Sequence, residues 1–249
     1  MKKILIGGES WIKHISHIKG FDIFTSCEFE TGVTWLKEAL EKRGFEVTHC
    51  PGHEVSENFP YTPEELSAYG AVVLSDIGAN SLLLTNKGFV KGQVIPDRIE
   101  SIKTYVENGG GFCMIGGYLS FSGIDAKARY SRTAINEILP VGILDRDDRI
   151  EKPAGIKPRT VKADHPVFRG IQGDWPHFLG YNQLEARPEG EMLATVGDNH
   201  PFVAVRSFGK GRTAAFASDA APHWGPPEFV NWKHYGDFWG NLFDWLCAK

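Results

Sequence analysis

Hydrophobic and polar positions alternate in blocks along the first half of the chain, and these blocks predict strands and helices in turn. Short apolar runs at 3–7, 71–75 and 112–115 have the length of buried strands. Between them, apolar residues recur at helical spacing over 33–40 and over 97–108. Apolar strands with helices between them favour a parallel sheet that is covered on both faces.

Turn and cap residues mark where these elements end. Gly44 stands where a helix C-cap is expected, and another strand is predicted over 45–49 before a Pro-Gly pair. Thr-Pro-Glu-Glu at 62–65 predicts a helix start, because threonine as N-cap and glutamate three residues later form a capping box. Three glycines at 109–111 end the second long helix.

The second half of the chain has a different pattern. Proline, glycine and charge are frequent over 140–174, which predicts loops and short strands. Segments 192–196, 201–208 and 212–218 read as sequential strands, the last two joined in a hairpin by Gly-Lys-Gly. Apolar residues share one face of a helix predicted over 234–246. No repeat or linker divides the chain, so we predict one α/β domain over residues 1–249.

Composition and charge exclude two classes of partner. The chain has 249 residues, 42% of them hydrophobic, which is enough for one sizeable core. Its net charge is -4 and no basic face is evident, so we expect no nucleic-acid binding. No apolar stretch approaches the roughly 20 residues of a membrane span. The charged run at 145–149 alternates in sign and is interpreted as a solvated loop.

The cysteines indicate a reducing compartment. The first apolar run stops after three residues, which is too short for the core of a signal peptide. Scattered cysteines without a C-x-x-C pair then favour free thiols and a cytoplasmic location. The four cysteines are Cys27, Cys50, Cys113 and Cys247.

Polar residues follow four of the predicted strands. Ligands of open parallel sheets collect beyond the carboxyl ends of the strands, which selects the loops at 8–11, 76–80, 116–120 and 218–224. The alternative is that their Asp and Asn side chains only cap helices and shape turns. Four converging loops favour a pocket. The candidate ligand-binding residues are Glu9, Asp76, Gly78, Asn80, Gly117, Ser120 and Trp224.

The segment 110–120 runs from a strand into a tight glycine turn, the setting of a nucleophile elbow. It contains Ile-Gly-Gly-Tyr-Leu-Ser-Phe at 115–121. With Leu-Ser-Asp-Ile-Gly-Ala-Asn at 74–80 and Ser-Asp-Ala-Ala-Pro-His-Trp-Gly at 218–225, it resembles the class I glutamine amidotransferase-like superfamily. The closer resemblance is to a branch of uncharacterised glutamine amidotransferase-like proteins that lack the elbow cysteine. It spans nearly the whole chain and implies a flavodoxin-like three-layer sandwich, with extra antiparallel strands in the C-terminal half.

The sequence departs from that superfamily where its chemistry lies. An amidotransferase elbow reads G-x-C-x-G, and here Tyr118 occupies the nucleophile position while Ser120 replaces the second glycine. His223 falls in the appropriate loop, but the glutamate of the His-x-Glu motif is missing. Cys113 lies inside a strand among apolar neighbours, so we expect a buried thiol with a raised pKa. Glutamine hydrolysis by a Cys-His-Glu triad is therefore not expected.

Two pairs of histidines have spacings that resemble metal sites. His14 and His17 lie in a predicted loop with no third ligand nearby in sequence. His49 and His53 are separated by proline and glycine, so they cannot share one helical face. We expect neither a metal nor a cofactor.

Three functional hypotheses remain open. The favoured one is a binding module for an unknown small polar metabolite, with a carbohydrate as one possibility because a planar tryptophan such as Trp224 suits a sugar ring. The second is a hydrolase in which His223 is the general acid or base and Asp76 or Asp219 orients it. In that enzyme Tyr118 would donate a proton or act as nucleophile, and the backbone N–H of Gly78 or Gly117 would stabilise an oxyanion.

The third hypothesis is a structural subunit of an oligomer, with the aromatic C-terminal segment as its interface. We also expect the protein to be a homo-oligomer. The candidate catalytic residues are Tyr118, His223 and Asp219.

Overall fold

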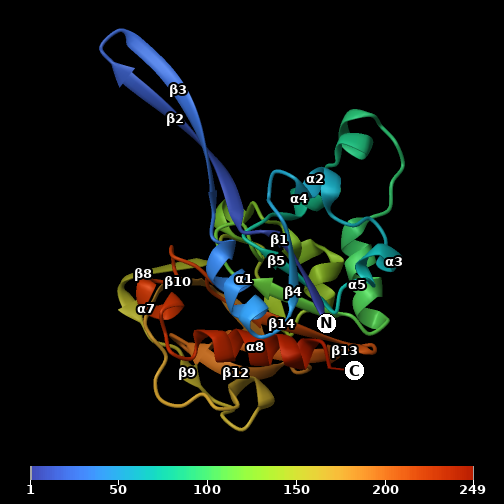
Figure 1. The fold of residues 1–249 in the computed structure, drawn as a ribbon, viewed down its shortest axis with the longest axis vertical. Coiled ribbons are helices and arrows are strands. Elements are labelled where there is room, and N and C mark those ends of the chain that lie inside the picture. Colours follow the sequence, from blue (N-terminus) through green and yellow to red (C-terminus); the bar gives the residue numbers. More distant parts are fainter. Residues whose placement is uncertain (1, 249) are drawn as a thin grey trace.

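An eight-stranded sheet forms the centre of the computed structural model, which describes residues 2–248 (Figure 1). Five neighbouring strands are parallel and three C-terminal strands extend the sheet in antiparallel pairing. In spatial order they are β4 (Glu46–Cys50), β1 (Lys3–Gly8), β5 (Ala71–Ser75), β6 (Gly111–Ile115), β14 (Gly211–Phe216), β13 (His200–Phe208), β12 (Glu191–Val196) and β9 (Arg159–Thr160).

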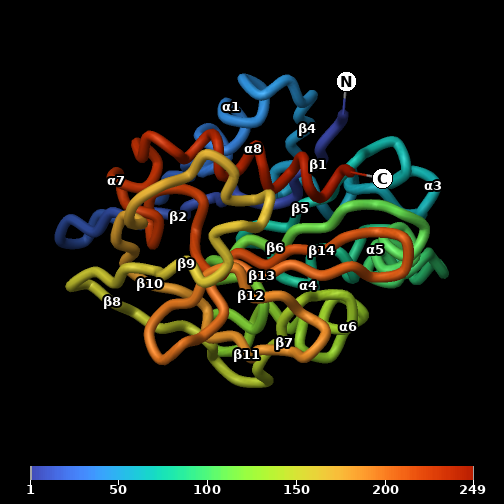
Figure 2. The backbone as a smooth tube through the Cα atoms, turned by 90° about the horizontal axis from the view of Figure 1, so that it is seen from below, coloured from blue at the N-terminus to red at the C-terminus, as the bar shows by residue number. Residues whose placement is uncertain are grey.

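Helices cover both faces of this sheet, as Figure 2 shows. Helices α1 (Val33–Lys42) and α8 (Tyr235–Leu246) pack together on one face, and α5 (Arg98–Glu107) and α6 (Ala134–Ile138) on the other. Every residue of β5 and β6 is buried, which explains why their sequences are almost wholly apolar. The predicted α/β class, with its mostly parallel sheet and C-terminal antiparallel strands, is confirmed.

Local signals place several helix ends correctly. The Thr62 side chain accepts from the backbone N–H of Glu65, and the Glu65 side chain accepts from the backbone N–H of Thr62. The predicted capping box therefore begins α3 (Pro63–Leu66). Asp97 caps α5 by accepting from the backbone of Ile99 and Glu100. The remaining short helices are α2 (Val55–Asn58), α4 (Ala79–Leu83) and α7 (Pro227–Val230).

Small sheets occupy the segment predicted to hold loops and short strands. β7 (Val141–Ile143) pairs with β11 (Leu184–Ala186), and β8 (Arg149–Ile156) pairs with β10 (Phe178–Asn182). Both pairs are antiparallel and lie outside the central sheet.

The prediction of a loop around His14 and His17 is wrong. Strands β2 (Ser10–Lys19) and β3 (Asp22–Thr31) form a long antiparallel hairpin, called the arm below, which projects from the body (Figure 1). The two histidines are three residues apart on one strand, so they point to opposite faces and cannot chelate one ion together. Partly buried and exposed residues alternate only in the first half of β2, near the body, because the outer half of the arm is exposed on both faces.

The aromatic C-terminal segment is part of the core. Trp239 is fully buried and packs edge-on against Phe216 and Phe238. Trp224 is also buried. These rings are therefore not exposed for the interface that the structural-subunit hypothesis assigned to this segment. Within residues 2–248 no helix is long and apolar enough to cross a bilayer.

Candidate functional site

A cavity of about 370 Å³ opens at the carboxyl ends of the parallel strands. Five of the residues predicted from strand ends line it: Glu9, Asp76, Tyr118, Asp219 and His223. The base of the arm supplies another part of the wall. The complete lining is Glu9, Trp11, Lys13, Glu30, Asp76, Tyr118, Asp219, Ala221, Pro222 and His223.

Backbone strain accompanies two of the carboxylates. Glu9 and Asp76 directly follow β1 and β5, and both adopt left-handed backbone with φ of 47° and 44°. Such conformations cost free energy for residues other than glycine and tend to occur at functional sites. Glu9 is held there because its N–H donates to the carbonyl oxygen of Ser75 at 2.6 Å, and the Ser75 hydroxyl donates to its carboxylate.

Burial and mutual repulsion disfavour charge on these carboxylates. Burial, then the nearby Asp219 and Asp76, raises the pKa of Glu9 from 4.5 to about 8. Burial, then Asp219, raises the pKa of Asp76 to about 6. At neutral pH Glu9 therefore retains a proton and Asp76 is mostly ionised. The cavity thus offers both a hydroxyl donor and a carboxylate acceptor.

Asp219 and His223 form a hydrogen-bonded pair. The Nδ1 and Oδ2 atoms lie 2.6 Å apart, and the Trp224 backbone N–H donates to the same oxygen at 2.9 Å. The hydrogen bond to Asp219 raises the pKa of His223, whereas burial raises the pKa of Asp219 against the influence of His223. The histidine side chain is 46% exposed, so its Nε2 is the ring nitrogen left to meet a ligand.

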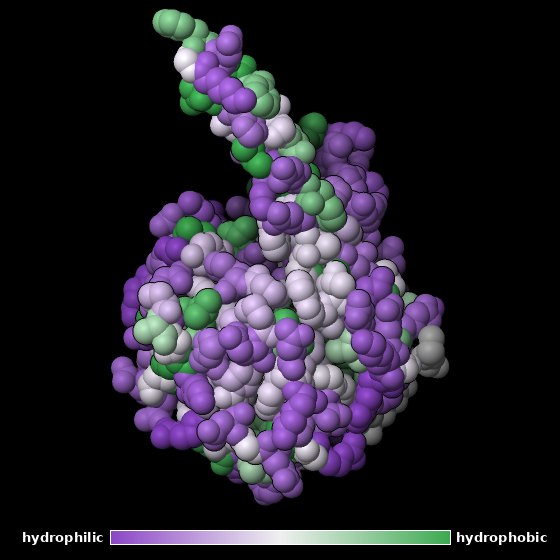
Figure 3. All heavy atoms as spheres, turned by 60° about the vertical axis from the view of Figure 1, so that its left-hand side comes forward, coloured by the Kyte–Doolittle hydropathy of each residue, from purple (hydrophilic) through white to green (hydrophobic). Residues whose placement is uncertain are grey.

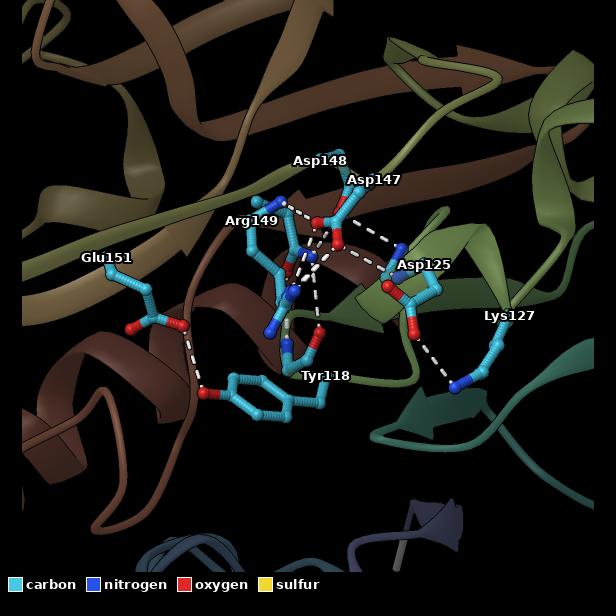
Figure 4. Close-up of polar contacts among 10 residues, drawn as sticks. Tyr118, Asp125, Lys127, Asp147, Asp148, Arg149 and Glu151 are labelled. Carbon is cyan, nitrogen blue, oxygen red and sulfur yellow. Dashed lines mark hydrogen bonds and ion pairs between the residues drawn. The ribbon is translucent and has the colours of Figure 1, made fainter.

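Tyr118 contacts His223 through its ring rather than its hydroxyl. The two rings meet edge to face with centroids 4.5 Å apart. The hydroxyl donates to Glu151 at 2.9 Å, as Figure 4 shows, and Trp224 donates its indole N–H to the same carboxylate. Burial, then Glu151, raises the pKa of Tyr118. This direction disfavours ionised Tyr118, the form that a nucleophilic role would require.

The turn after β6 differs from a strained nucleophile elbow. A nucleophile elbow places its nucleophile in a strained backbone conformation. Here Glu9 and Asp76 have a positive φ, but Tyr118, at the nucleophile position, does not. Gly117 has φ of 142°, and a Cβ there would lie 2.8 Å from Asp76 Oδ1, so glycine is required. Its N–H donates to Asn182 at 3.0 Å. That N–H is therefore not free to stabilise an oxyanion, which removes one of the two backbone donors, Gly78 and Gly117, that the hydrolase hypothesis named.

Five predicted ligand-binding residues do not line the cavity, and Gly117, described above, is one of them. Ser120 is buried and accepts from the N–H of Asp76, so it positions that residue. Gly78 packs near Ala128, and Asn80 borders a separate hollow beside α4. Trp224 is buried behind His223, with the two rings stacked at 5.5 Å.

Asp148 corrects the interpretation of the charged run as a solvated loop. Its carboxylate is 1% exposed and accepts from the backbone of Ser122 and Gly123 and from the Asn182 side chain. The Asn182 side chain in turn accepts from the N–H of Gly117 and donates to its carbonyl oxygen. The interpretation holds for Asp145, Arg146 and Asp147, which are exposed in the loop before β8, and Asp147 forms an ion pair with Arg149 (Figure 4).

Sequence reasoning missed the residues that reach the site from other elements. Trp11, Lys13 and Glu30 come from the arm, where Glu30 accepts from the indole and forms an ion pair with the lysine. Glu151 comes from β8, outside the central sheet. The rule that ligands collect beyond the carboxyl ends of parallel strands, called the strand-end rule below, cannot find such residues. No local motif marks them either.

No cysteine is among the residues that line the cavity. Cys113 is fully buried in β6, and burial raises its pKa far above the ordinary value. Cys27 is exposed on the arm. Among residues 2–248, no three His, Cys, Asp or Glu side chains are arranged to hold a metal ion.

Thiol labelling is expected to follow this burial. A maleimide at neutral pH should label Cys27 first and leave Cys113 unmodified until the protein unfolds. Mass spectrometry of digested samples taken over time measures each site. The Cys27→Ser variant is the control and should lose the fastest phase. Rapid native labelling of Cys113 would contradict the assignment of a structural thiol.

A mostly parallel sheet with an Asp–His pair and a glycine turn at its carboxyl edge defines an amidotransferase-like α/β protein. The chain belongs to the family described as "Putative glutamine amidotransferase", whose model matches residues 3–248. This membership confirms the resemblance read from the three sequence motifs.

Solved structures agree with the family. The chain is 46% identical to Cytoplasmic Protein STM3548 from Salmonella typhimurium, with a TM-score of 0.95 over 99% of both chains. It is 44% identical to Cytoplasmic Protein STM1381 from Salmonella typhimurium LT2, with a TM-score of 0.93 over 98% of this chain and 99% of the other. A "Putative thua-like protein" from Bacteroides uniformis shares the fold at 14% identity and a TM-score of 0.59, over 98% and 91% of the chains. No curated protein matches the chain.

Proposed function

We propose that this chain is a binding protein for a small neutral polyhydroxyl metabolite, a sugar or polyol, and does not hydrolyse glutamine through a thiol. The observation that carries the proposal is the convergence of Glu9, Asp76 and Asp219 on one cavity. Cytoplasmic location is part of the proposal. The names of the two Salmonella relatives and the free cysteines of this chain support it.

The charges in the cavity favour a neutral ligand. Glu9 is protonated at neutral pH, Asp219 is paired with His223, and Glu30 is paired with Lys13. Asp76 is the remaining carboxylate without a cationic partner within hydrogen-bonding distance among the described residues. Hydroxyl groups both donate and accept, so they can satisfy a protonated and an ionised carboxyl side by side. Tyr118 and Trp11 also line the cavity, and their aromatic rings supply apolar wall for the carbon face of a sugar ring.

A thermal-shift titration tests this proposal. Glucose, galactose, mannose, myo-inositol and sorbitol are compared with glutamine, a sugar phosphate and spermidine. A neutral polyol should raise the melting temperature progressively with its concentration, because it binds only the folded state. Asp76→Asn and His223→Ala should weaken the apparent affinity by about tenfold or more, as expected for loss of a hydrogen bond to a charged group.

Asp125→Asn is the matched control, since Asp125 is an exposed aspartate that does not line the cavity and pairs with Lys127. It should leave every shift unchanged. Binding of spermidine or the sugar phosphate alone would reject a neutral ligand. Release of glutamate from glutamine would show that the protein retains glutaminase activity, and would contradict the proposal.

Hydrolysis is the second candidate function, and the 2.6 Å Asp219–His223 contact favours it. A buried aspartate that orients a half-exposed histidine is the arrangement of a general base. The nucleophile would then be water, since Tyr118 is bound to Glu151. Nitrophenyl esters and glycosides distinguish this candidate. Turnover that disappears in His223→Ala, and rises with pH through a value above 6.5 because the histidine pKa is raised, would support it.

A further inference from the structure

The arm exposes large apolar side chains to solvent. Ile18 is 70% exposed, Ile23 67% and Phe21, at the tip, 106%. In Figure 3 the projection that stands clear of the body carries hydrophobic (green) surface among hydrophilic patches. A two-stranded ribbon is marginally stable in water without a packing partner. An exposed apolar surface of this kind marks an interaction site.

The two faces of the arm differ in character. Residues directly opposite each other on paired strands have their side chains on the same face, so the register of the hairpin assigns each pair to one of its two faces. All five charged residues of the arm (Lys13, Lys19, Asp22, Glu28 and Glu30) lie on one face, called the charged face. The other, the uncharged face, carries in order the pairs Ile12–Phe29, His14–Cys27, Ser16–Thr25 and Ile18–Ile23.

The order of these pairs on the uncharged face is self-complementary. Ser10–Thr31, the pair of this face nearest the body, is set apart because Ser10 is buried. Beyond it the order runs apolar, polar, polar, apolar, and therefore reads the same from either end. A second copy packed antiparallel on this face places Ile12–Phe29 of one arm over Ile18–Ile23 of the other. The polar pairs then meet at the centre. A two-fold dimer requires a patch that complements itself in this way, whereas an unrelated partner does not.

Four apolar side chains of the uncharged face contribute to the contact area. Ile12 is 47% exposed, Ile18 70%, Ile23 67% and Phe29 52%. Phe21 lies in the turn at the tip, beyond the paired residues, and extends the apolar surface there. These side chains supply part of the ~800 Å² that one partner contributes to a standard interface.

We propose that the arm is a self-association element. The uncharged faces of two arms pack antiparallel about a two-fold axis that passes between the His14–Cys27 and Ser16–Thr25 pairs. The charged faces point away from this contact, toward solvent along the outer arm and toward the ligand cavity at the base, and the bodies lie at opposite ends of the paired arms. This site is separate from the ligand cavity, so its failure would leave the proposed binding function standing.

Sedimentation velocity of the full-length protein tests the proposal. The wild type should sediment as a species of twice the 27.7 kDa chain mass. The double variant Ile18→Ser, Ile23→Ser should weaken dimerisation by on the order of 100-fold or more, because each copy loses two buried side chains. Ile15→Ser is the matched control, since Ile15 lies on the charged face of the same strand. It should remain dimeric.

Cross-linking gives an independent readout on the unmodified arm. Cys27 is exposed and lies beside the proposed axis. A bismaleimide that spans the ~10 Å between packed sheets should therefore join two copies, and Cys27→Ser should abolish the product. A monomeric wild type would overturn the proposal and assign the face to another partner. A dimer that persists in the double variant, or that fails to cross-link at Cys27, would also overturn it.

Discussion

Replacing Glu9 with glutamine is expected to raise the free energy of unfolding at pH 8.5 by on the order of 3–5 kcal/mol, with little change at pH 5. Burial, then Asp219 and Asp76, raises the pKa of Glu9 from 4.5 to about 8 in the folded protein. Between those values the folded chain retains a proton that the unfolded chain has lost. Wild-type stability therefore falls as pH rises through this range, and glutamine removes that loss because it cannot ionise.

Urea unfolding of both proteins across pH 5 to 8.5 measures this difference. Glu30→Gln is the matched control, because Glu30 lines the same cavity but is more exposed, and its hydrogen bond to Lys13 lowers its pKa. That variant should gain no stability at alkaline pH. Parallel stability curves for the wild type and Glu9→Gln would show that Glu9 is not held neutral by its surroundings.

Replacing Asp148 with alanine is expected to lower the free energy of unfolding by on the order of 3–5 kcal/mol. The Asp148 carboxylate accepts from Ser122 at 2.8 Å, from Gly123 at 3.0 Å and from the Asn182 side chain at 2.8 Å. Alanine leaves three buried donors without an acceptor. Because Asn182 also holds Gly117, the turn beside the cavity should lose amide-exchange protection in the same variant.

Asp147→Ala tests whether this effect is specific to the buried carboxylate. Asp147 is adjacent in sequence, and its side chain is 35% exposed in an ion pair with Arg149. Exposed pairs contribute little, so this variant should lose less than about 1 kcal/mol. Denaturant unfolding compares the two variants directly. Equal losses would mean that the network around Asp148 does not hold the turn in place.

The sequence allowed the central sheet to be predicted because burial dictates its composition. β5 and β6 are buried on both faces, so apolar runs bounded by glycine identify them without ambiguity. The arm could not be predicted in this way. Its partners are solvent and its own second strand, and a Gly-Phe connection is not one of the strong hairpin turn signals.

The strand-end rule accounts for what could and could not be predicted at the site. It selected Glu9, Asp76, Asp219 and His223, which meet at one cavity because parallel strands end at the same edge. It also selected Asn80, but α4 carries that side chain to a different hollow. Glu151 and Asp148 were out of its reach, since β8 and the loop before it join the site from outside the central sheet.

A single residue, Glu9, separates the last residue of β1 from the first residue of β2. Glu9 therefore connects the body directly to an arm strand ten residues long. Trp11, Lys13 and Glu30 lie at the base of the arm and also line the cavity. If the arm tilted about its base, the shape of the cavity would change with it, and a ligand in the cavity would in turn bias the position of the arm, because such linkage acts equally in both directions.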